Sequence, residues 1–172
     1  MNYDIIRNQL FGGSLKQSQV DGIENLIEEW AVRGFKDIRW FAYILATVYH
    51  ETAGKMQPIN EYGGETYLKN KPYYPYYGRD LVQTTWKGNY EKVKKFTGVD
   101  VVSNPALIAD PKTSSKVAIE FMNKGWYTGK KLAHYFNDKL DDPRNARRII
   151  NGLDKAEHIA DIYQVFYKAL IN

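Results

Sequence analysis

Residues 36–54, KDIRWFAYILATVYHETAG, include the most hydrophobic stretch of this chain. From Trp40 to Tyr49 the residues are apolar on nearly every side of a helix, which is typical of a helix buried in a core. Gly54 is well suited to end such a helix. The sequence therefore predicts a central buried helix over residues 36–52 whose last turn carries the carboxyl group of Glu51.

Apolar residues recur at helical spacing on both sides of this segment. The spacing predicts further helices over residues 18–33, 86–97, 112–124, 129–137, 143–151 and 154–171. Ser18 is the expected N-cap of the first helix. Pro105, Pro111 and Pro143 stand where helices are expected to begin.

Residues 55–85 interrupt the helical pattern. They hold several glycines, three of the six prolines and the tyrosine cluster at residues 73–77, with no clear period. A segment this long without a period usually forms a functional loop, and we expect a short hairpin within it. No repeat or linker divides the sequence, so residues 1–172 are predicted to form a single, mainly α domain.

Composition narrows the classes of protein that this chain can belong to. The absence of cysteine excludes disulfides and thiolate zinc sites and agrees with a reducing cytoplasm. No apolar run is long enough to span a bilayer, and the first residues lack the pattern of a secretory signal. The net charge of +4 suits an anionic partner. We expect a monomer that is made in the cytoplasm.

Three carboxylates lie at or shortly after the end of the central helix in the sequence. Both the helix dipole and poor hydration favour the neutral form of Glu51, as a general acid requires. Glu61 and Glu65 follow in a glycine-containing loop that is expected to be better hydrated, where a carboxylate can act as a base. Glycosidases divide the work between two carboxyl groups in this way. The alternative is that Glu51 pairs with Lys55 and the other two are merely solvated.

Four ordered blocks of sequence resemble the chitinase-like glycoside hydrolases of family 19. They are HETAGKMQPINEYG at 50–63, YYGRDLVQTTWKGNYEKV at 76–93, TGVDVVSNPALIADP at 97–111 and ARRIINGLDKAEHIADIY at 146–163. With QSQVDGIE at 17–24, they are most similar to the compact bacteriophage branch, the endolysins that cut host peptidoglycan. The resemblance implies a lysozyme-like helical fold of two lobes with a central cleft, and inverting hydrolysis without a metal or cofactor.

The resemblance also assigns roles to single residues. Glu51 matches the general acid and Glu61 the base, with Glu65 in reserve, while Thr85 matches the hydroxyl that holds the attacking water. Positions that match the substrate cleft are Tyr77, Gln83, Trp86, Asn89 and Asn151.

Two departures from the family pattern lie in one block. Asp80 stands where the family usually has glycine, and Thr84 replaces a common leucine. We expect the backbone to differ slightly at Asp80. The departures bear on the substrate subsites more than on the catalytic pair.

Other charged and ionisable residues have less specific patterns. Arg148 is expected to approach the cleft and pair with a carboxylate, and His50 to order the helix end or line the cleft. A zinc peptidase of the HExxH type needs its second histidine at position 54, which is Gly54. His134 and His158 lie in ordinary helical patterns and are predicted to be structural.

Two further helical segments, one rich in lysine and one amphipathic, are candidate sites for nucleic acid or membrane, and neither is predicted to bind them. The lysines at 92, 94 and 95 are predicted to be a solvated helix face, and no nucleic-acid motif accompanies them. The segment 154–171 is predicted to pack on the core, and membrane contact through it is not favoured because its polar face has mixed charge.

The predicted function is that of an endolysin acting on peptidoglycan glycan strands, which would reach the wall from the host cytoplasm once the membrane is permeabilised. Two alternatives remain: a chitinase, and a non-catalytic glycan-binding or virion protein on the same scaffold.

Overall fold

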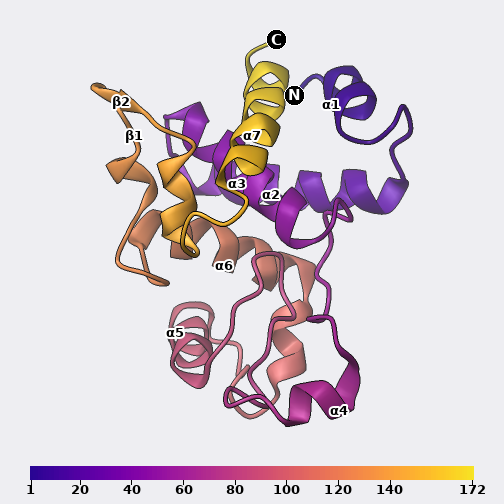
Figure 1. Ribbon diagram of the computed structural model, residues 1–172, viewed down its shortest axis with the longest axis vertical. Helices are drawn as coiled ribbons and strands as arrows, with labels where there is room; N and C mark the ends of the chain where they lie inside the picture. The colour runs from indigo at the N-terminus through magenta and orange to yellow at the C-terminus, as the bar shows by residue number, and fades with distance from the viewer.

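The computed structural model describes residues 1–172 and shows two lobes of unequal size (Figure 1). The smaller lobe holds α4 (Gly64–Lys69) and α5 (Lys87–Thr97), and α6 (Pro111–Lys124) runs along the junction. The larger lobe is built from α1 (Tyr3–Gln9), α2 (Gln17–Arg33), α3 (Ile38–Glu51), α7 (Ala156–Ile171) and a hairpin of β1 (Phe136–Asn137) and β2 (Leu140–Asp141). Three short 3-10 helices complete the chain, η1 (Pro105–Ala109), η2 (Leu132–His134) and η3 (Asn145–Ile149).

The predicted buried helix is α3, and it forms the centre of the larger lobe. All eight residues from Phe41 to Val48 are buried. Helices α2, α6 and α7 all contact α3, and α7 lies along it (Figure 1). Asp37 caps the N-terminus, because its carboxylate accepts a hydrogen bond from the Arg39 N–H at 3.1 Å. A helix that is apolar on all sides is stable only when it is covered on all sides, as α3 is.

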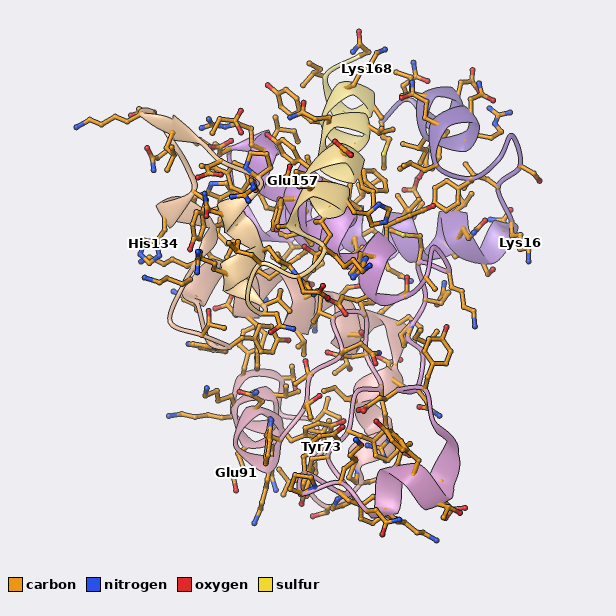
Figure 2. The ribbon with its side chains drawn as sticks, in the orientation of Figure 1. Lys16, Tyr73, Glu91, His134, Glu157 and Lys168 are labelled. Carbon is orange, nitrogen blue, oxygen red and sulfur yellow. The ribbon has the colours of Figure 1, made fainter.

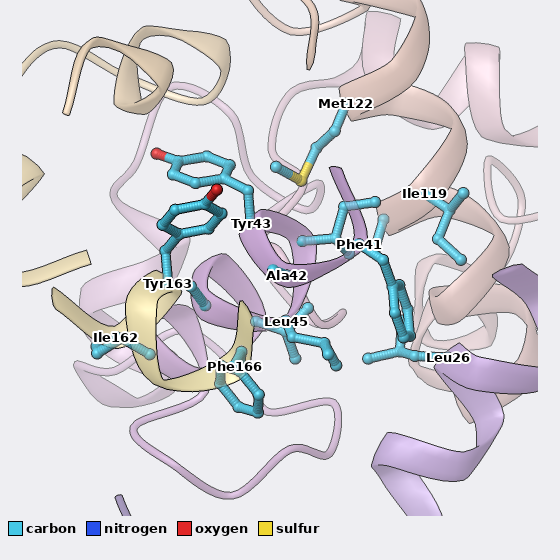
Figure 3. Packing of buried hydrophobic residues seen from close by; sticks show 14 of the residues in the cluster. Leu26, Phe41, Ala42, Tyr43, Leu45, Ile119, Met122, Ile162, Tyr163 and Phe166 are labelled. Atoms are coloured by element: carbon cyan, nitrogen blue, oxygen red, sulfur yellow. The ribbon is translucent and has the colours of Figure 1, made fainter. Parts of the chain in front are cut away.

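Aromatic side chains fill much of the space around α3 (Figure 3). The rings of Tyr43 and Tyr163 lie 6.2 Å apart, and Tyr163 belongs to α7. Phe166, one turn further along α7, is also fully buried. The amphipathic segment 154–171 therefore packs on the core as predicted. No helix of the structure combines the length and the hydropathy needed to cross a bilayer.

The smaller lobe has its own apolar core. Tyr90 and Val93 of α5 pack there against Ile108 of η1 and against α6. From α6, Val117 and Phe121 belong to this core, whereas Ala118, Ile119 and Met122 belong to the main core. Helix α6 thus presents opposite faces to the two lobes and holds them together.

The predicted helices over 18–33, 86–97, 112–124 and 154–171 are confirmed to within two residues, and α1 was not predicted. The N-cap of α2 is Lys16 rather than Ser18, because the Gln19 side chain accepts the Lys16 N–H at 2.9 Å. Pro105 and Pro111 begin η1 and α6 as predicted. Pro143 does not begin a helix, since η3 starts at Asn145.

Two predicted helices are wrong in type. Residues 129–137 form η2 and the first strand of the hairpin, and residues 143–151 form only the short η3. The hairpin lies at 136–141 rather than in 55–85, and the side chain of Asn137 supports its turn by accepting the Lys139 N–H at 3.0 Å. The irregular segment 55–85 contains one short helix, α4.

Gly22 allows α2 to approach the loop that follows α3. A Cβ atom at this position would lie 1.8 Å from the carbonyl oxygen of Met56, a buried residue. We expect Gly22→Ala to lower the free energy of unfolding by about 2 kcal/mol, because the backbone of the loop must shift to make room. Urea denaturation measures this effect.

Gly88, in α5, is the matched control. A methyl group added at Gly88 would meet no other atom within 4 Å, and the residue lies in a helix. Gly88→Ala should therefore raise the free energy of unfolding by about 0.5 kcal/mol. Equal effects of the two substitutions would contradict the close approach at Gly22.

Candidate active site

A cavity of about 530 Å³ lies where the two lobes meet. The larger lobe contributes Glu51 from the end of α3 and residues from η3 and the segment after it. The smaller lobe contributes Glu61, Tyr73 and the segment that leads into α5. The full lining is Glu51, Glu61, Tyr73, Val82, Gln83, Thr85, Trp86, Asn89, Tyr127, Arg147, Ile150 and Asn151. Seven of the eleven residues predicted for the site are therefore brought together here.

Glu51 forms an ion pair with Arg147. The Arg147 Nη1 atom lies 2.7 Å from Glu51 Oε1, and the two side chains are only 5% and 16% exposed. Arg147 Nε also donates to the carbonyl oxygen of Asp154 at 3.1 Å, which fixes the guanidinium. The expected poor hydration of Glu51 is thus present. The helix dipole and burial both favour the neutral form of Glu51. The guanidinium of Arg147 opposes them, because a positive charge favours the carboxylate.

The expected pairing of Arg148 with a carboxylate and the alternative pairing of Glu51 with Lys55 are both wrong. Arg147 rather than Arg148 reaches the carboxylate, and Lys55 does not take part. Arg148 is exposed, and its Nε atom lies 3.5 Å from Asn145 Oδ1. Neighbouring residues in a 3-10 helix point about 120° apart, so only one of two adjacent arginines can face the cavity. Arg147 and Arg148 lie four and three residues before Asn151, so either could share a helical face with it. Sequence spacing alone therefore does not show which arginine reaches the cavity.

Glu61 is held by residues of the smaller lobe. The hydroxyl group of Tyr73 donates to Glu61 Oε1 at 2.6 Å, and the Gly78 N–H donates to Oε2 at 3.4 Å. Burial and the contact with this carboxylate raise the pKa of Tyr73 to about 12, so its hydroxyl remains a donor at neutral pH. Tyr73 lies in the smaller lobe (Figure 2). The two carboxyl groups of the cavity therefore have separate supports, one in each lobe.

The tyrosine of the 73–77 cluster that lines the cavity is not the predicted one. Tyr77, which was predicted to lie in the cleft, does not line the cavity. Its ring stacks with Tyr74 and is covered by the Arg79 guanidinium, 3.4 Å from the ring centroid. Tyr73, which is not among the predicted cleft positions, lines the cavity and packs edge-on against Trp86. An irregular segment has no period from which the inward-facing ring could be chosen.

Glu65, the reserve base, and His50, which is expected to order the helix end or line the cleft, both lie outside the cavity lining. Glu65 is in the first turn of α4, 78% exposed, and the hydrogen bond and ion pair with Lys69 lower its pKa. His50 is half-buried and packs edge-on against His158 with the ring centroids 5.8 Å apart. Burial lowers the pKa of His50. Only Glu61 of the two loop carboxylates is in place to face Glu51.

The floor of the cavity is a tightly bonded turn. The Gln83 amide donates to the carbonyl oxygens of Ile59 and Asp80 at 2.8 and 3.1 Å, which ties the turn to the segment before Glu61. A Cβ atom at Gly78 would lie 2.5 Å from Gln83 Oε1, so a larger residue there would force the Gln83 side chain to shift. Gln83 thus has a structural role that was not predicted.

Thr85 and Trp86 of this turn, and Asn89 in the first turn of α5, also line the cavity. The Thr85 hydroxyl donates to the Gln83 carbonyl at 3.0 Å, and its lone pairs are left to accept other hydrogen bonds. The Asn89 amide donates to the Thr85 carbonyl at 2.9 Å. Trp86 is 53% exposed, and its flat ring forms an apolar surface at the edge of the cavity.

A mainly helical protein of two lobes, with a carboxyl group from each lobe in the cavity between them, has the arrangement of lysozyme-like proteins. Comparison with known proteins identifies the family within that class. Residues 42–134 match the family described as chitinase class I, which is more than half of the chain. The chain belongs to glycoside hydrolase family 19.

Curated relatives support this assignment over part of their length. An endochitinase A2 of Pisum sativum is 31% identical and an acidic endochitinase of Petunia hybrida is 37% identical. The matches cover 48% and 46% of this chain but 32% and 33% of those proteins. The chain thus spans about a third of the length of the curated relatives it matches.

Solved structures agree with the fold over almost the whole chain. Chitinase C from Streptomyces griseus HUT6037 matches with a TM-score of 0.68 at 20% identity, covering 100% of this chain and 79% of that one. A bacterial family 19 chitinase matches with a TM-score of 0.67 at 22% identity, covering 97% and 93%. The predicted lysozyme-like fold is therefore confirmed.

The adjacent arginines provide a test of the ion pair. Arg147→Met should lower the free energy of unfolding at pH 7 by about 3 kcal/mol, because it leaves the Glu51 carboxylate buried without its partner. Arg148→Met should change it by less than about 0.5 kcal/mol, since Arg148 is exposed. Urea denaturation of both variants gives the comparison.

A double substitution tests whether Arg147 and Glu51 are energetically coupled. Adding Glu51→Gln to Arg147→Met should recover part of the lost stability, because no unpaired charge is then buried. If the two substitutions were simply additive, the ion pair would not couple these residues.

Proposed function

We propose that the cleft hydrolyses β-1,4 glycosidic bonds with inversion of configuration. The observation that carries this proposal is that Glu51 and Glu61 line one cavity with separate, different supports. Membership of glycoside hydrolase family 19 supports the same reaction class. Inverting glycosidases need two carboxyl groups far enough apart to hold a water molecule between base and sugar.

In this mechanism protonated Glu51 donates its proton to the glycosidic oxygen as the bond from that oxygen to the sugar C1 breaks. The donation leaves a carboxylate at Glu51. Arg147, 2.7 Å away and almost fully buried, stabilises the negative charge that forms there. The buried ion pair thus favours the product side of the proton transfer.

Glu61 is the proposed base. Its carboxylate accepts the Tyr73 hydroxyl and, at longer distance, the Gly78 N–H, and it retains lone pairs for a water molecule. That water attacks C1 from the face opposite the leaving group, and Glu61 takes its proton. The Thr85 hydroxyl has free lone pairs to help hold the same water.

The proposed substrate is the glycan strand of bacterial peptidoglycan. The resemblance of several sequence blocks to the phage endolysins supports this choice, and the net charge of +4 suits an anionic cell envelope. The exposed Trp86 ring suits the apolar face of a sugar. In this proposal a monomer accumulates in the host cytoplasm and acts on the wall after the membrane is permeabilised.

Chitin is the second candidate substrate. The observation in its favour is that the curated relatives are named endochitinases. Peptidoglycan and chitin share β-1,4-linked N-acetylated hexosamines, so the same pair of carboxyl groups suits either polymer. Release of reducing ends from purified sacculi and from chitin oligomers separates the two, and turnover of chitin alone would refute the endolysin proposal.

Single substitutions test the two catalytic roles. We expect Glu51→Gln and Glu61→Gln each to lower kcat by about 10³-fold, since each removes a proton donor or acceptor of the reaction. Glu65→Gln is the matched control and should stay within about twofold of the wild type, because this residue is exposed on α4. The assay is release of reducing ends from sacculi.

Each outcome has a clear meaning. Undiminished hydrolysis by Glu51→Gln would rule out the proposed acid. If Glu65→Gln were impaired and Glu61→Gln were not, the base would be Glu65. A wild-type protein that binds glycan without releasing reducing ends would instead favour a binding role.

A further inference from the structure

A buried carboxyl group lies behind the floor of the cleft and has no part in the proposed reaction. Asp80 is completely buried. Its Oδ1 atom accepts the Thr84 N–H at 2.6 Å, and its Oδ2 atom accepts the Thr84 hydroxyl at 2.6 Å. The Thr84 hydroxyl also lies 2.6 Å from the hydroxyl of Tyr127, which lines the cleft. A continuous hydrogen-bonded chain thus runs from Asp80 to the cleft wall.

Asp80 and Thr84 are the two positions at which this block of sequence departs from the family pattern. The structure bonds them to one another through two contacts. A carboxyl group without a partner would be costly at a fully buried position. The threonine hydroxyl supplies that partner, so the two departures form a matched pair.

The direction of this chain depends on the protonation of Asp80. A carboxylate can only accept, so Thr84 must donate to ionised Asp80, and Tyr127 must then donate to Thr84. When Asp80 is neutral, its proton lies on Oδ2, because Oδ1 already accepts the Thr84 N–H. Asp80 then donates to Thr84, Thr84 donates to Tyr127, and the Tyr127 proton is free to point into the cleft.

The same bonds also hold the turn that forms the cleft floor. Gln83 and Trp86, on either side of Thr84 and Thr85, have φ angles of 57° and 78°. Non-glycine residues rarely adopt this left-handed conformation, and it persists only where surrounding contacts enforce it. The two bonds from Thr84 to Asp80 are such contacts, and Thr85 is the next residue.

We propose that Asp80 is a positioning residue which, through Thr84, fixes the turn that presents Thr85 and sets whether the Tyr127 hydroxyl offers the cleft a lone pair or a proton. The consequence for activity rests on the proposed glycan hydrolysis in this cleft. Ionised Asp80 holds the turn more firmly, because hydrogen bonds to a charged acceptor are stronger than those to a neutral one.

The switch should operate in mildly acidic solution. Burial raises the pKa of Asp80 to about 6, although the hydrogen bonds from Thr84 act to lower it. Other titratable groups face Asp80 from neighbouring elements: Glu51 of α3, Tyr90 of α5 and Tyr127 after α6. From α6, the Ser114 hydroxyl oxygen accepts a hydrogen bond from the Leu81 N–H at 2.7 Å. The serine hydroxyl does not titrate in water.

Asp80→Asn imitates the neutral acid, because its amide NH₂ donates to Thr84 as a protonated carboxyl does. We expect the kcat of this variant to lie within about twofold of that of the wild type near pH 5, where Asp80 is mostly neutral. Near pH 7.5 it should be about tenfold lower, the factor that corresponds to exchanging a charge-assisted hydrogen bond for a neutral one. KM should change little. A ratio of the two kcat values that stays constant across this range would overturn the proposal.

Substitutions at Thr84 test whether the effect passes through its hydroxyl group. Thr84→Val removes that hydroxyl, and the pH dependence assigned to Asp80 should disappear from kcat. Thr84→Ser restores the hydroxyl and should restore the profile. Thr47→Val is the matched control, because the Thr47 hydroxyl is buried but bonds only to the carbonyl of Tyr43 in its own helix. A profile lost equally in Thr47→Val would refute the role of Thr84.

A measurement without substrate separates this proposal from the proposed function. Carbon-13 NMR of the wild-type protein should show the Asp80 carboxyl titrating near pH 6, with the ring carbon that bears the Tyr127 hydroxyl following the same midpoint. In Asp80→Asn the Tyr127 signal should not titrate there. If Tyr127 is insensitive to Asp80, the relay is refuted, whether or not glycan is cleaved. If the relay titrates but no glycan is cleaved, only the proposed function fails.

The pH dependence of thermal stability checks the direction in which the pKa of Asp80 is shifted. The pKa of Asp80 is raised above its usual value in the folded protein, so the folded state binds the proton more tightly than the unfolded state does. The Tm of the wild type should therefore fall relative to that of Asp80→Asn as the pH rises through about 6. A relative rise over the same range would contradict the burial of a proton-binding carboxyl at this position.

Discussion

The structure depends on the need to cover α3 from every side. Its eight consecutive buried residues leave no solvent-facing stripe, so α2, α6 and α7 must all pack around one rod. The end of this rod is the place where the chain must turn away, and Glu51 lies there in the last helical turn. A carboxyl group is thus brought to the boundary between core and cleft by the packing of the helix that carries it.

Because the surroundings of Glu51 are dry, its partner has to be local and well oriented. Arg147 meets this need from a short 3-10 helix nearly a hundred residues later in the chain, and the carbonyl oxygen of Asp154 fixes the guanidinium. Glu61 has a different kind of support, a neutral tyrosine hydroxyl and a backbone N–H. The asymmetry gives two carboxyl groups of one cleft different chemical surroundings, as the proposed division between acid and base requires.

The sequence predicts the parts of this protein that follow a period. The central helix, α5, α6 and α7 are recovered because apolar spacing determines which face is buried, and blocks of family resemblance locate Glu51, Glu61, Thr85 and Asn151 at the cavity. It fails where no period exists. Nothing local distinguishes Tyr73 from Tyr77, or Arg147 from Arg148, since in each pair the choice depends on how an irregular segment meets another element. The short η3 and the hairpin are likewise stabilised by tertiary contacts and single side-chain bonds more than by local preference.

The apolar interior is divided into two clusters of very different size, and this division affects the order in which the lobes unfold on heating. The main cluster holds 27 buried residues and that of the smaller lobe holds six, so the smaller lobe is the weaker cooperative unit. Tyr73, Gln83, Trp86 and Asn89 all belong to the part of the cleft on that side. Loss of the proposed glycan hydrolysis on warming would then precede the melting of the helical bundle, and inactivation temperature and calorimetric midpoint would report on two separate events.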